Sequence, residues 1–211
     1  MICVSLGKIS VNEALQICKE VKIVEIRADL LLWSKDDYKK IIATGVKTVF
    51  TCRPGQLNER DRLELYQFAA GSGVNYIDIE LESGNAFREN VLGIIKSNPA
   101  ELIISYHNYE NTPDYEELNS ILEDCYSKSA DVAKIACRVY SPSDAARLLS
   151  LYEKTGRKII IGMGNAGKIT RIAAGLMGAE FTFASSGSGN ETAEGQINYK
   201  NMKEIYRIIN S

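Results

Sequence analysis

Apolar and polar positions follow a repeating order along the chain, in which short apolar runs are separated by longer amphipathic segments. The runs recur at intervals of about 25 residues and are rich in β-branched side chains, which is typical of strands. Eight runs are therefore predicted as strands, at 2–6, 22–28, 47–53, 75–81, 101–107, 131–137, 158–164 and 180–186.

The segments between these runs carry apolar residues at the spacing of an amphipathic helix. Ser10 followed by Glu13 has the spacing of a capping box, which marks the start of one helix. Gly45 and Gly156 are placed to end helices, and Pro142 is placed to begin one. Helical segments are predicted within 10–20, 36–45, 113–129, 141–156 and 198–211.

Strand and helix alternate eight times, and this count is typical of a (β/α)8 barrel. The chain has 211 residues, near the lower size of such barrels, which is about 200 residues. An open, doubly wound parallel sheet is the alternative, because alternation alone does not prove that a sheet closes. No stretch of altered composition marks a boundary, so the sequence predicts a single α/β domain, a TIM barrel, over residues 1–211.

Charged residues interrupt several predicted strands, although the strands of a parallel sheet should be apolar on both faces. Glu25, Arg27 and Asp29 alternate with apolar neighbours, and the two-residue period of a strand places all three on one face. Asp78 and Glu80 share this alternation. In a barrel the charged faces would point inward, and the C-terminal ends of the strands would form the active site. Further candidates at or near such ends are Arg53, His107 and Lys134.

Other interpretations of these charges stay open at the level of sequence. An alternating strand is also typical of a half-exposed antiparallel sheet with one solvated face. Asp78 and Glu80 could instead belong to a structural ion-pair network with Arg53 or Lys134. His107 is the single histidine, and it could be a hydrogen-bonded core residue.

Lys134 lies inside the apolar run 131–137, where an ammonium group is costly unless it is paired or loses its proton. A neutral amine attacks ketones and aldehydes to form a Schiff base, which acidifies the neighbouring C–H bond. His107 suits removal of that proton, because imidazole titrates near neutral pH, and Glu25 could hold its other ring nitrogen. The planar guanidinium groups of Arg27, Arg53 and Arg171 could hydrogen-bond a carboxylate or hydroxyls of a substrate. These residues predict an imine-forming lyase or aldolase that acts on a small anionic keto substrate.

Composition narrows the choice of partners and compartment. The formal net charge of −2 disfavours nucleic acid and charged membrane surfaces, which both attract basic proteins. No apolar run approaches the ~20 residues of a membrane span, and the first residues lack the layout of a signal peptide. The five cysteines are scattered, which predicts reduced thiols in a cytoplasmic protein. A single histidine and the lack of paired cysteines disfavour a zinc site.

Six short motifs at predicted strand ends resemble, in their order, those of the type I 3-dehydroquinate dehydratase family. They are EIRADLL (25–31), TCRP (51–54), SYHNY (105–109), DVAKIA (131–136), GMGNAGKITR (162–171) and AEGQI (193–197). The resemblance implies a (β/α)8 barrel that acts without metal or cofactor in the third step of the shikimate pathway. The implied reaction is a syn elimination of water from 3-dehydroquinate through a lysine imine, giving 3-dehydroshikimate. Because dimers are common in the family, it also implies a homodimer.

The resemblance further implies roles for individual residues. Lys134 would form the imine with the substrate ketone, and Glu25 would orient His107. His107 would remove the C2 proton and then deliver a proton to the departing C1 hydroxyl. Arg171 would bind the substrate carboxylate. Hydroxyl contacts would come from Arg27, Arg53 and Gln196, and apolar pocket walls from Met163 and Phe183.

Two positions depart from the family pattern. The family usually has a serine–alanine pair before its closing Gly-Gln, whereas this chain has Thr192 and Ala193, which keep a hydroxyl at the site. The family often has a glutamate four residues after the arginine of the third strand. This chain has Leu57 at that position, with Glu59 two residues further on, so the role of that glutamate is left unassigned.

Two glycine-rich stretches flank these binding residues. Residues 187–195 are predicted to be a mobile loop that closes over the site, because Gln196 directly follows them. Residues 162–167 could instead cradle a phosphate, although they lack the full P-loop or dinucleotide fingerprint.

Two other functions stay open. A class I aldolase or transaldolase-like barrel would use the same lysine to break a C–C bond of a sugar phosphate, and predicts a phosphate site near the last two strands. A barrel with only a binding or structural role predicts that Lys134 is permanently paired with Asp78 or Glu80 and is unreactive.

Overall fold

The computed structural model describes residues 1–31, 33–187 and 189–211. Within them the chain forms eight strands and eight α-helices in strict alternation. The strands are β1 (Ile2–Leu6), β2 (Ile23–Arg27), β3 (Lys47–Thr51), β4 (Tyr76–Glu80), β5 (Glu101–Asn108), β6 (Val132–Arg138), β7 (Lys158–Met163) and β8 (Thr182–Ser185). The helices are α1 (Val11–Cys18), α2 (Lys35–Ile42), α3 (Glu59–Gly71), α4 (Asn85–Lys96), α5 (Tyr115–Ser127), α6 (Pro142–Ser150), α7 (Lys168–Ala174) and α8 (Tyr199–Ile209).

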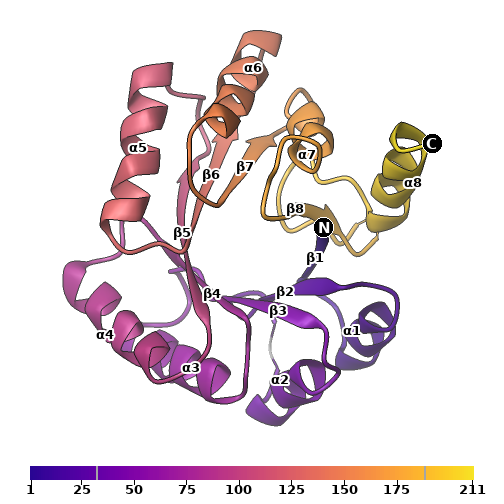
Figure 1. Ribbon diagram of the computed structural model, residues 1–211. Helices are drawn as coiled ribbons and strands as arrows, with labels where there is room; N and C mark the ends of the chain where they lie inside the picture. Colours follow the sequence, from indigo (N-terminus) through magenta and orange to yellow (C-terminus); the bar gives the residue numbers. More distant parts are fainter. Residues whose placement is uncertain (32, 188) are drawn as a thin grey trace.

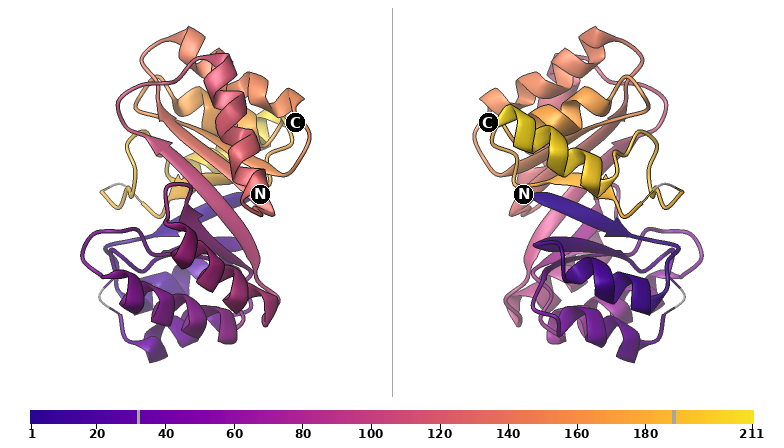
Figure 2. Two further views of the ribbon diagram at one scale, coloured as in Figure 1. Left: turned by 90° about the vertical axis from the view of Figure 1, so that its left-hand side faces the viewer. Right: turned by 90° about the vertical axis from the view of Figure 1, so that its right-hand side faces the viewer.

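All strand pairs are parallel, and neighbours in the sheet are neighbours in sequence from β1 to β7. β8 pairs with β1 on its other side, which brings the last strand back to the first. The remaining seam lies between β7 and β8, where the Glu180 N–H donates to the Lys158 carbonyl at 3.0 Å. The helices surround this nearly closed barrel on its outside (Figures 1 and 2). The predicted TIM barrel is confirmed, and the open doubly wound sheet is wrong.

Local signals explain where several helices begin. Ser10 and Glu13 form the predicted capping box at the start of α1, and Pro142 begins α6 after a second capping box. The segment predicted to extend to Gly156 ends sooner, because α6 stops at Ser150 and passes into a 3-10 turn, Leu151–Glu153. None of the helices in the described ranges has the length and apolar character needed to cross a membrane.

The two-residue period of the strands divides the apolar side chains into two cores. In β2, Val24 and Ile26 point outward into the large core beneath the helices, whereas Ile23 points into the barrel. The inner core fills the barrel interior with side chains such as Tyr76 and Phe181, whose rings meet edge to face. The strands are therefore covered on both sides, and the interpretation as a half-exposed antiparallel sheet is wrong.

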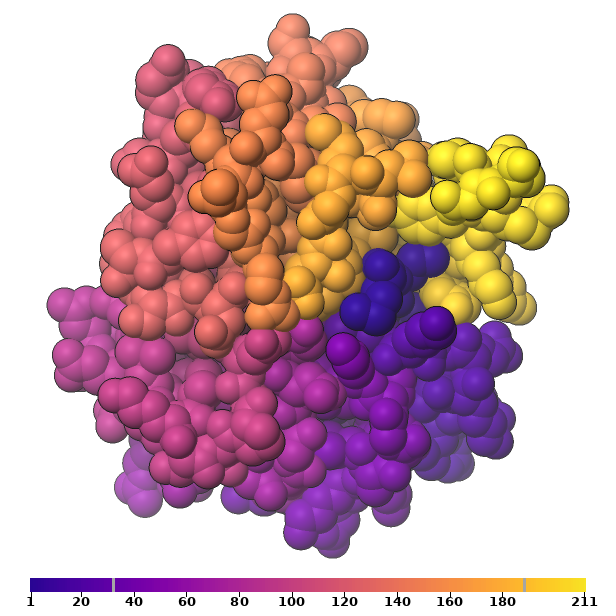
Figure 3. All heavy atoms as spheres, viewed as in Figure 1, coloured from indigo at the N-terminus to yellow at the C-terminus, as the bar shows by residue number. Residues whose placement is uncertain are grey.

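The two termini lie close together on one face of the barrel. In the space-filling view, the first residues, in indigo, lie between the segments that follow them and the C-terminal helix, in yellow (Figure 3). Many inward positions nearer the C-terminal strand ends are polar and buried, among them Glu25, Asp78, Ser105 and Lys134. The fold thus places apolar side chains beneath a layer of charged side chains inside the barrel.

Candidate active site

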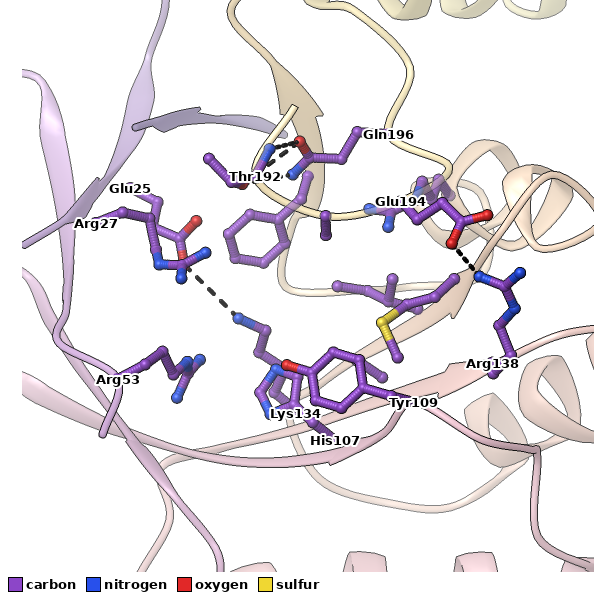
Figure 4. A pocket seen from close by; sticks show the side chains of 16 residues that line it. Glu25, Arg27, Arg53, His107, Tyr109, Lys134, Arg138, Thr192, Glu194 and Gln196 are labelled. Atoms are coloured by element: carbon purple, nitrogen blue, oxygen red, sulfur yellow. Dashed lines mark hydrogen bonds and ion pairs between the residues drawn. The ribbon is translucent and has the colours of Figure 1, made fainter. Parts of the chain in front are cut away.

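A pocket of about 260 Å³ opens at the C-terminal ends of the strands. Its lining includes every residue that the sequence predicted for the site: Glu25, Arg27, Arg53, His107, Lys134, Met163, Arg171, Phe183, Thr192 and Gln196. They come from six different strands or the segments that follow them, and their side chains converge on one space (Figure 4). The structure brings the predicted residues together, while their individual roles remain predictions.

Lys134 lies at the centre of the pocket floor, and its side chain is only 6% exposed. Its Nζ donates to Asp78 Oδ2 at 2.9 Å and lies 3.8 Å from Glu25 Oε1. The same ammonium nitrogen lies 4.3 Å from the centre of the Phe183 ring, which forms one wall of the pocket. The amine is therefore held in one position by two carboxylates and an aromatic face.

Asp78 shares its carboxylate between Lys134 and other donors. Arg53 Nη2 lies 2.9 Å from Asp78 Oδ1, and the Ser105 hydroxyl donates to the same oxygen at 2.6 Å. Burial favours the neutral acid, but Arg53 and Lys134 outweigh it and hold the pKa of Asp78 well below its usual range. Asp78 therefore stays ionised, and Lys134 is not the only cation that neutralises it.

The ion-pair network that the sequence left open is present in the structure. Arg53 also binds Glu80 at 2.7 Å, and Glu80 accepts from Arg62 at the same distance. Glu80 therefore pairs with the two arginines, and within the described residues it forms no ion pair with Lys134. Burial lowers the pKa of Arg53, but Asp78 and Glu80 outweigh it, so Arg53 remains charged.

His107 is half-buried beside the lysine, and the ring of Tyr109 stacks on it at 6.0 Å between centroids and an interplanar angle of 14°. Its burial, together with the positive charges of Arg53 and Lys134, lowers the pKa of His107 well below its ordinary value of 6.5. The imidazole is therefore neutral at neutral pH. A neutral imidazole has an unprotonated nitrogen, so the ring can act as a base.

Glu25 was predicted to orient His107, but the structure places it beside the lysine. Its two oxygens accept hydrogen bonds from the hydroxyls of Ser5, at 2.7 Å, and Thr51, at 3.0 Å. Ser5 and Thr51 lie on the strands that flank Glu25, so the register of β1, β2 and β3 fixes the carboxylate. No hydrogen bond among the described residues joins Glu25 to His107, the contact that the structure shows is with Lys134, and the orienting role of Glu25 stays a prediction.

Arg171 is the arginine of the pocket with an unused guanidinium. Arg27 pairs with Asp29, Arg53 with Asp78 and Glu80, and Arg138 with Glu194. Arg171, only 1% exposed, has no hydrogen-bond partner at Nε or Nη2 among the residues the structure describes. Its burial lowers the pKa of the guanidinium to about 10, so it still carries its charge at neutral pH. A buried, unpaired cation that borders a cavity is suited to bind an anion from that cavity.

Thr192 and Gln196, in the segment after β8, form another part of the pocket wall. The Gln196 side chain accepts from the Thr192 N–H at 2.9 Å and donates to the Ser5 hydroxyl at 3.3 Å. Ser188, within the predicted closing loop 187–195, lies outside the described residues. The described part of that loop lies against the pocket, and its motion stays a prediction.

The glycine stretch 162–167, for which the sequence left a phosphate cradle open, uses several of its own N–H groups within the chain. The Gly162 N–H donates to the Thr170 hydroxyl at 2.7 Å, and the Gly167 N–H donates to the Gly164 carbonyl at 3.2 Å. The Gly164 N–H itself donates to the Glu194 carbonyl, at 3.2 Å. Three of the N–H groups of this stretch are therefore occupied by the chain, and phosphate binding by the others stays a prediction.

Several residues of the site were missed by the sequence reasoning. Tyr109 follows His107 by two residues and Arg138 follows Lys134 by four, so the strand period places each pair on one side. Ser5, one residue before the end of the first strand, lies on its inward face. Glu194 carried no such signal, because it lies in an irregular segment where no period applies.

The fold and the pocket define a (β/α)8 barrel enzyme whose site lies at the C-terminal ends of the strands. The chain matches the family model for type I 3-dehydroquinase over residues 2–211, and it belongs to that family. It is 34% identical to 3-dehydroquinate dehydratase from Methanococcus maripaludis strain C6 over 226 aligned positions, which cover 99% of this chain and 100% of the relative.

Solved structures agree with this assignment. The 3-dehydroquinate dehydratase from Aquifex aeolicus VF5 superposes with a TM-score of 0.86 at 32% identity, over 99% of this chain and 98% of that one. The enzyme from Geobacillus kaustophilus HTA426 has a TM-score of 0.84 at 28% identity, over 99% of this chain and 90% of that one.

We predict that Arg171 lowers the stability of the free protein. Replacing it by the apolar Arg171→Met removes an unpaired buried charge, so the free energy of unfolding should rise by about 1–4 kcal/mol in urea denaturation. Arg62→Met is the matched control, because Arg62 is equally buried but bonds Glu80 and the Cys52 carbonyl. The control should lower the free energy of unfolding. If the free energy of unfolding falls equally in both variants, Arg171 stabilises the fold and is not kept unpaired for a ligand.

Proposed function

We propose that the protein is a 3-dehydroquinate dehydratase that forms a Schiff base at Lys134 and converts 3-dehydroquinate into 3-dehydroshikimate, a step of the shikimate pathway. The observation that carries the proposal is the convergence of Lys134, neutral His107 and unpaired Arg171 in one pocket. These groups match the ketone, the acidic C–H bond and the carboxylate of one small substrate. The family to which the chain belongs supports the same reaction.

The pocket suggests how the substrate would lie. Its carboxylate would bind the free guanidinium of Arg171, and its ketone would reach the amine of Lys134. The substrate hydroxyls would meet polar side chains around the rim, namely Arg27, Arg53, Thr192 and Gln196. Met163 and Phe183 would cover the carbocycle and exclude water, which strengthens each polar contact.

The reaction begins with nucleophilic attack of neutral Lys134 on the ketone carbon, followed by loss of the carbonyl oxygen as water. The resulting protonated imine withdraws electrons and acidifies the adjacent C2–H bond. His107 accepts the C2 proton and returns it to the C1 hydroxyl, so that the C1–O bond breaks with departure of water. Hydrolysis of the imine consumes one water and releases the amine, so the net change is loss of one water.

The shared carboxylate of Asp78 explains how Lys134 can react although it is paired. When the amine loses its charge, Asp78 keeps its contacts with Arg53 and with the Ser105 hydroxyl. The deprotonated state therefore leaves no unpaired buried carboxylate. This sharing favours a reactive lysine over the alternative in which the Lys134–Asp78 pair serves only structure.

Three N–H groups of residues 162–167 bond within the chain, which leaves fewer donors for the sugar phosphate that the aldolase alternative requires. All five cysteines are unpaired and buried, which supports the proposed cytoplasmic location. The homodimer implied by the family resemblance stays a prediction, as does the expectation that no nucleic acid or membrane is bound.

The first test combines turnover with chemical trapping. Addition of 3-dehydroquinate should give the ultraviolet absorbance of a conjugated enone, and borohydride should then fix the substrate to the protein. Mass spectrometry should locate the adduct on Lys134. Lys158 is the internal control, because it is equally buried but bonds two backbone carbonyls at the other end of the barrel.

Lys134→Met should abolish both signals. His107→Ala should slow turnover by about 10²–10⁴-fold, the usual contribution of a general acid–base, while slow adduct formation remains. An adduct on another lysine, or full activity of His107→Ala, would contradict the assigned roles.

The second test is the dependence of kcat/KM on pH. A base must be unprotonated to act, and the pKa of His107 is lowered by burial and by the neighbouring cations. The rate should therefore fall only when the pH drops below 6.5, the ordinary histidine value. A half-maximal rate at or above that pH would show that the environment does not lower the pKa of the base.

A further inference from the structure

Residues 189–195, the part of the closing loop after position 188, and Gln196 directly after them cross the mouth of the pocket without an apolar anchor. The sequence GNETAEGQ contains no large apolar side chain, so burial of apolar surface cannot hold the loop in place. Polar contacts must fasten it. The figure of the pocket shows two such contacts, one within the loop and one between the loop and β6 (Figure 4).

The first polar contact that holds the loop in place is a hydrogen bond between backbone groups. The Gly164 N–H donates to the Glu194 carbonyl at 3.2 Å, next to Gly195. Gly195 has a positive φ of 79°, and a Cβ at this position would collide with the Gly164 carbonyl. Gly195 of the loop therefore lies so close to Gly164, just after β7, that a side chain at position 195 would not fit.

A second fastening connects the loop to the lysine. Gln196 donates to the Ser5 hydroxyl at 3.3 Å, and Ser5 donates to Glu25 at 2.7 Å. Glu25 Oε1 lies 3.8 Å from Lys134 Nζ. The position of the closing loop is thus linked to the reacting amine through two hydrogen bonds and one ion pair.

The third fastening is an ion pair between Arg138, at the end of β6, and Glu194 of the loop. The Arg138 side chain is 25% exposed and that of Glu194 is 64% exposed. Arg138 lies 5.3 Å from the centre of the Tyr140 ring, which limits its freedom before the pair forms. Arg138 lines the pocket, so the pair bridges the mouth from one wall to the loop.

We propose that Arg138 and Glu194 are positioning residues, whose ion pair holds the closing loop so that Thr192 and Gln196 face the substrate. Arg138 itself does not bind the substrate carboxylate, because Glu194 already occupies its guanidinium, whereas Arg171 is free. The effect on catalysis rests on the proposed function, but the effect on the loop does not. The pair favours the closed loop and thereby tightens substrate binding without taking part in the chemistry.

The test uses Glu194→Gln, Arg138→Gln and the double variant. Glu204→Gln is the matched control, because Glu204 pairs with Arg207 on the surface of α8, away from the pocket. Hydrogen exchange of the Gly164 amide is measured by NMR without substrate, since this amide donates directly to the loop. Each single variant should exchange about two- to fivefold faster, as expected for a pair near the surface, and Glu204→Gln should not change the rate.

Turnover gives the second readout. KM for 3-dehydroquinate should rise by about the same two- to fivefold in each single variant, with little change in kcat. The double variant should resemble either single variant, because the two residues act as one unit.

Unchanged Gly164 exchange in Glu194→Gln would overturn the proposal. A rise of KM in Arg138→Gln without a rise in Glu194→Gln would also overturn it, and would make Arg138 a substrate-binding residue. If the wild-type protein does not convert 3-dehydroquinate but exchange responds as expected, the proposed function fails while the assigned role of the pair in the loop stands.

Discussion

The sharing of one buried carboxylate between two cations is the interaction on which the site depends. Asp78 has no exposed surface, and it binds both Lys134 and Arg53 at 2.9 Å. A lone lysine at this position would leave a costly unpaired charge, and an Asp78 bound to Lys134 alone would lose its ion pair when the amine reacts. The second cation, Arg53, keeps Asp78 paired when Lys134 reacts with the substrate ketone. Burial, together with the same positive charges, lowers the pKa of His107 and keeps the ring neutral and able to act as a base.

The barrel makes this arrangement possible. Parallel strands turn alternate side chains inward, and the apolar inner core supports the charged layer from below. Each charged side chain is fixed by groups on neighbouring strands, as Glu25 is by Ser5 and Thr51. The segment after β8 then closes the space from above through Thr192 and Gln196. Rigid strands thus supply the reacting groups, and an irregular segment supplies contacts that can change when substrate enters.

Much of this architecture could be predicted from the sequence because it follows from local periodicity. The alternation of Glu25 and Arg27 with apolar residues indicated an inward charged face, and the structure confirms the fold that this face requires. The position of Lys134 in an apolar run indicated the centre of the site. These features depend on residues close together in the chain, where the pattern carries the information.

Contacts between distant segments could not be predicted in this way. The partner of Glu25 depends on the register of three strands, and this register places the carboxylate beside Lys134 instead of His107. The pair of Arg138 and Glu194 joins positions 56 residues apart through an irregular loop. The sequence likewise does not show that the Arg171 guanidinium is unpaired, because this depends on which carboxylates the other arginines bind.

The most direct test of the account is a crystal structure of the protein after borohydride reduction in the presence of 3-dehydroquinate. We predict a covalent bond at Lys134 Nζ, with the ligand carboxylate on Arg171. Asp78 should keep its contacts with Arg53 and Ser105 although the lysine has reacted. A bond to another residue, or an Asp78 carboxylate that has lost Arg53, would contradict the claim that this shared carboxylate frees the lysine for chemistry.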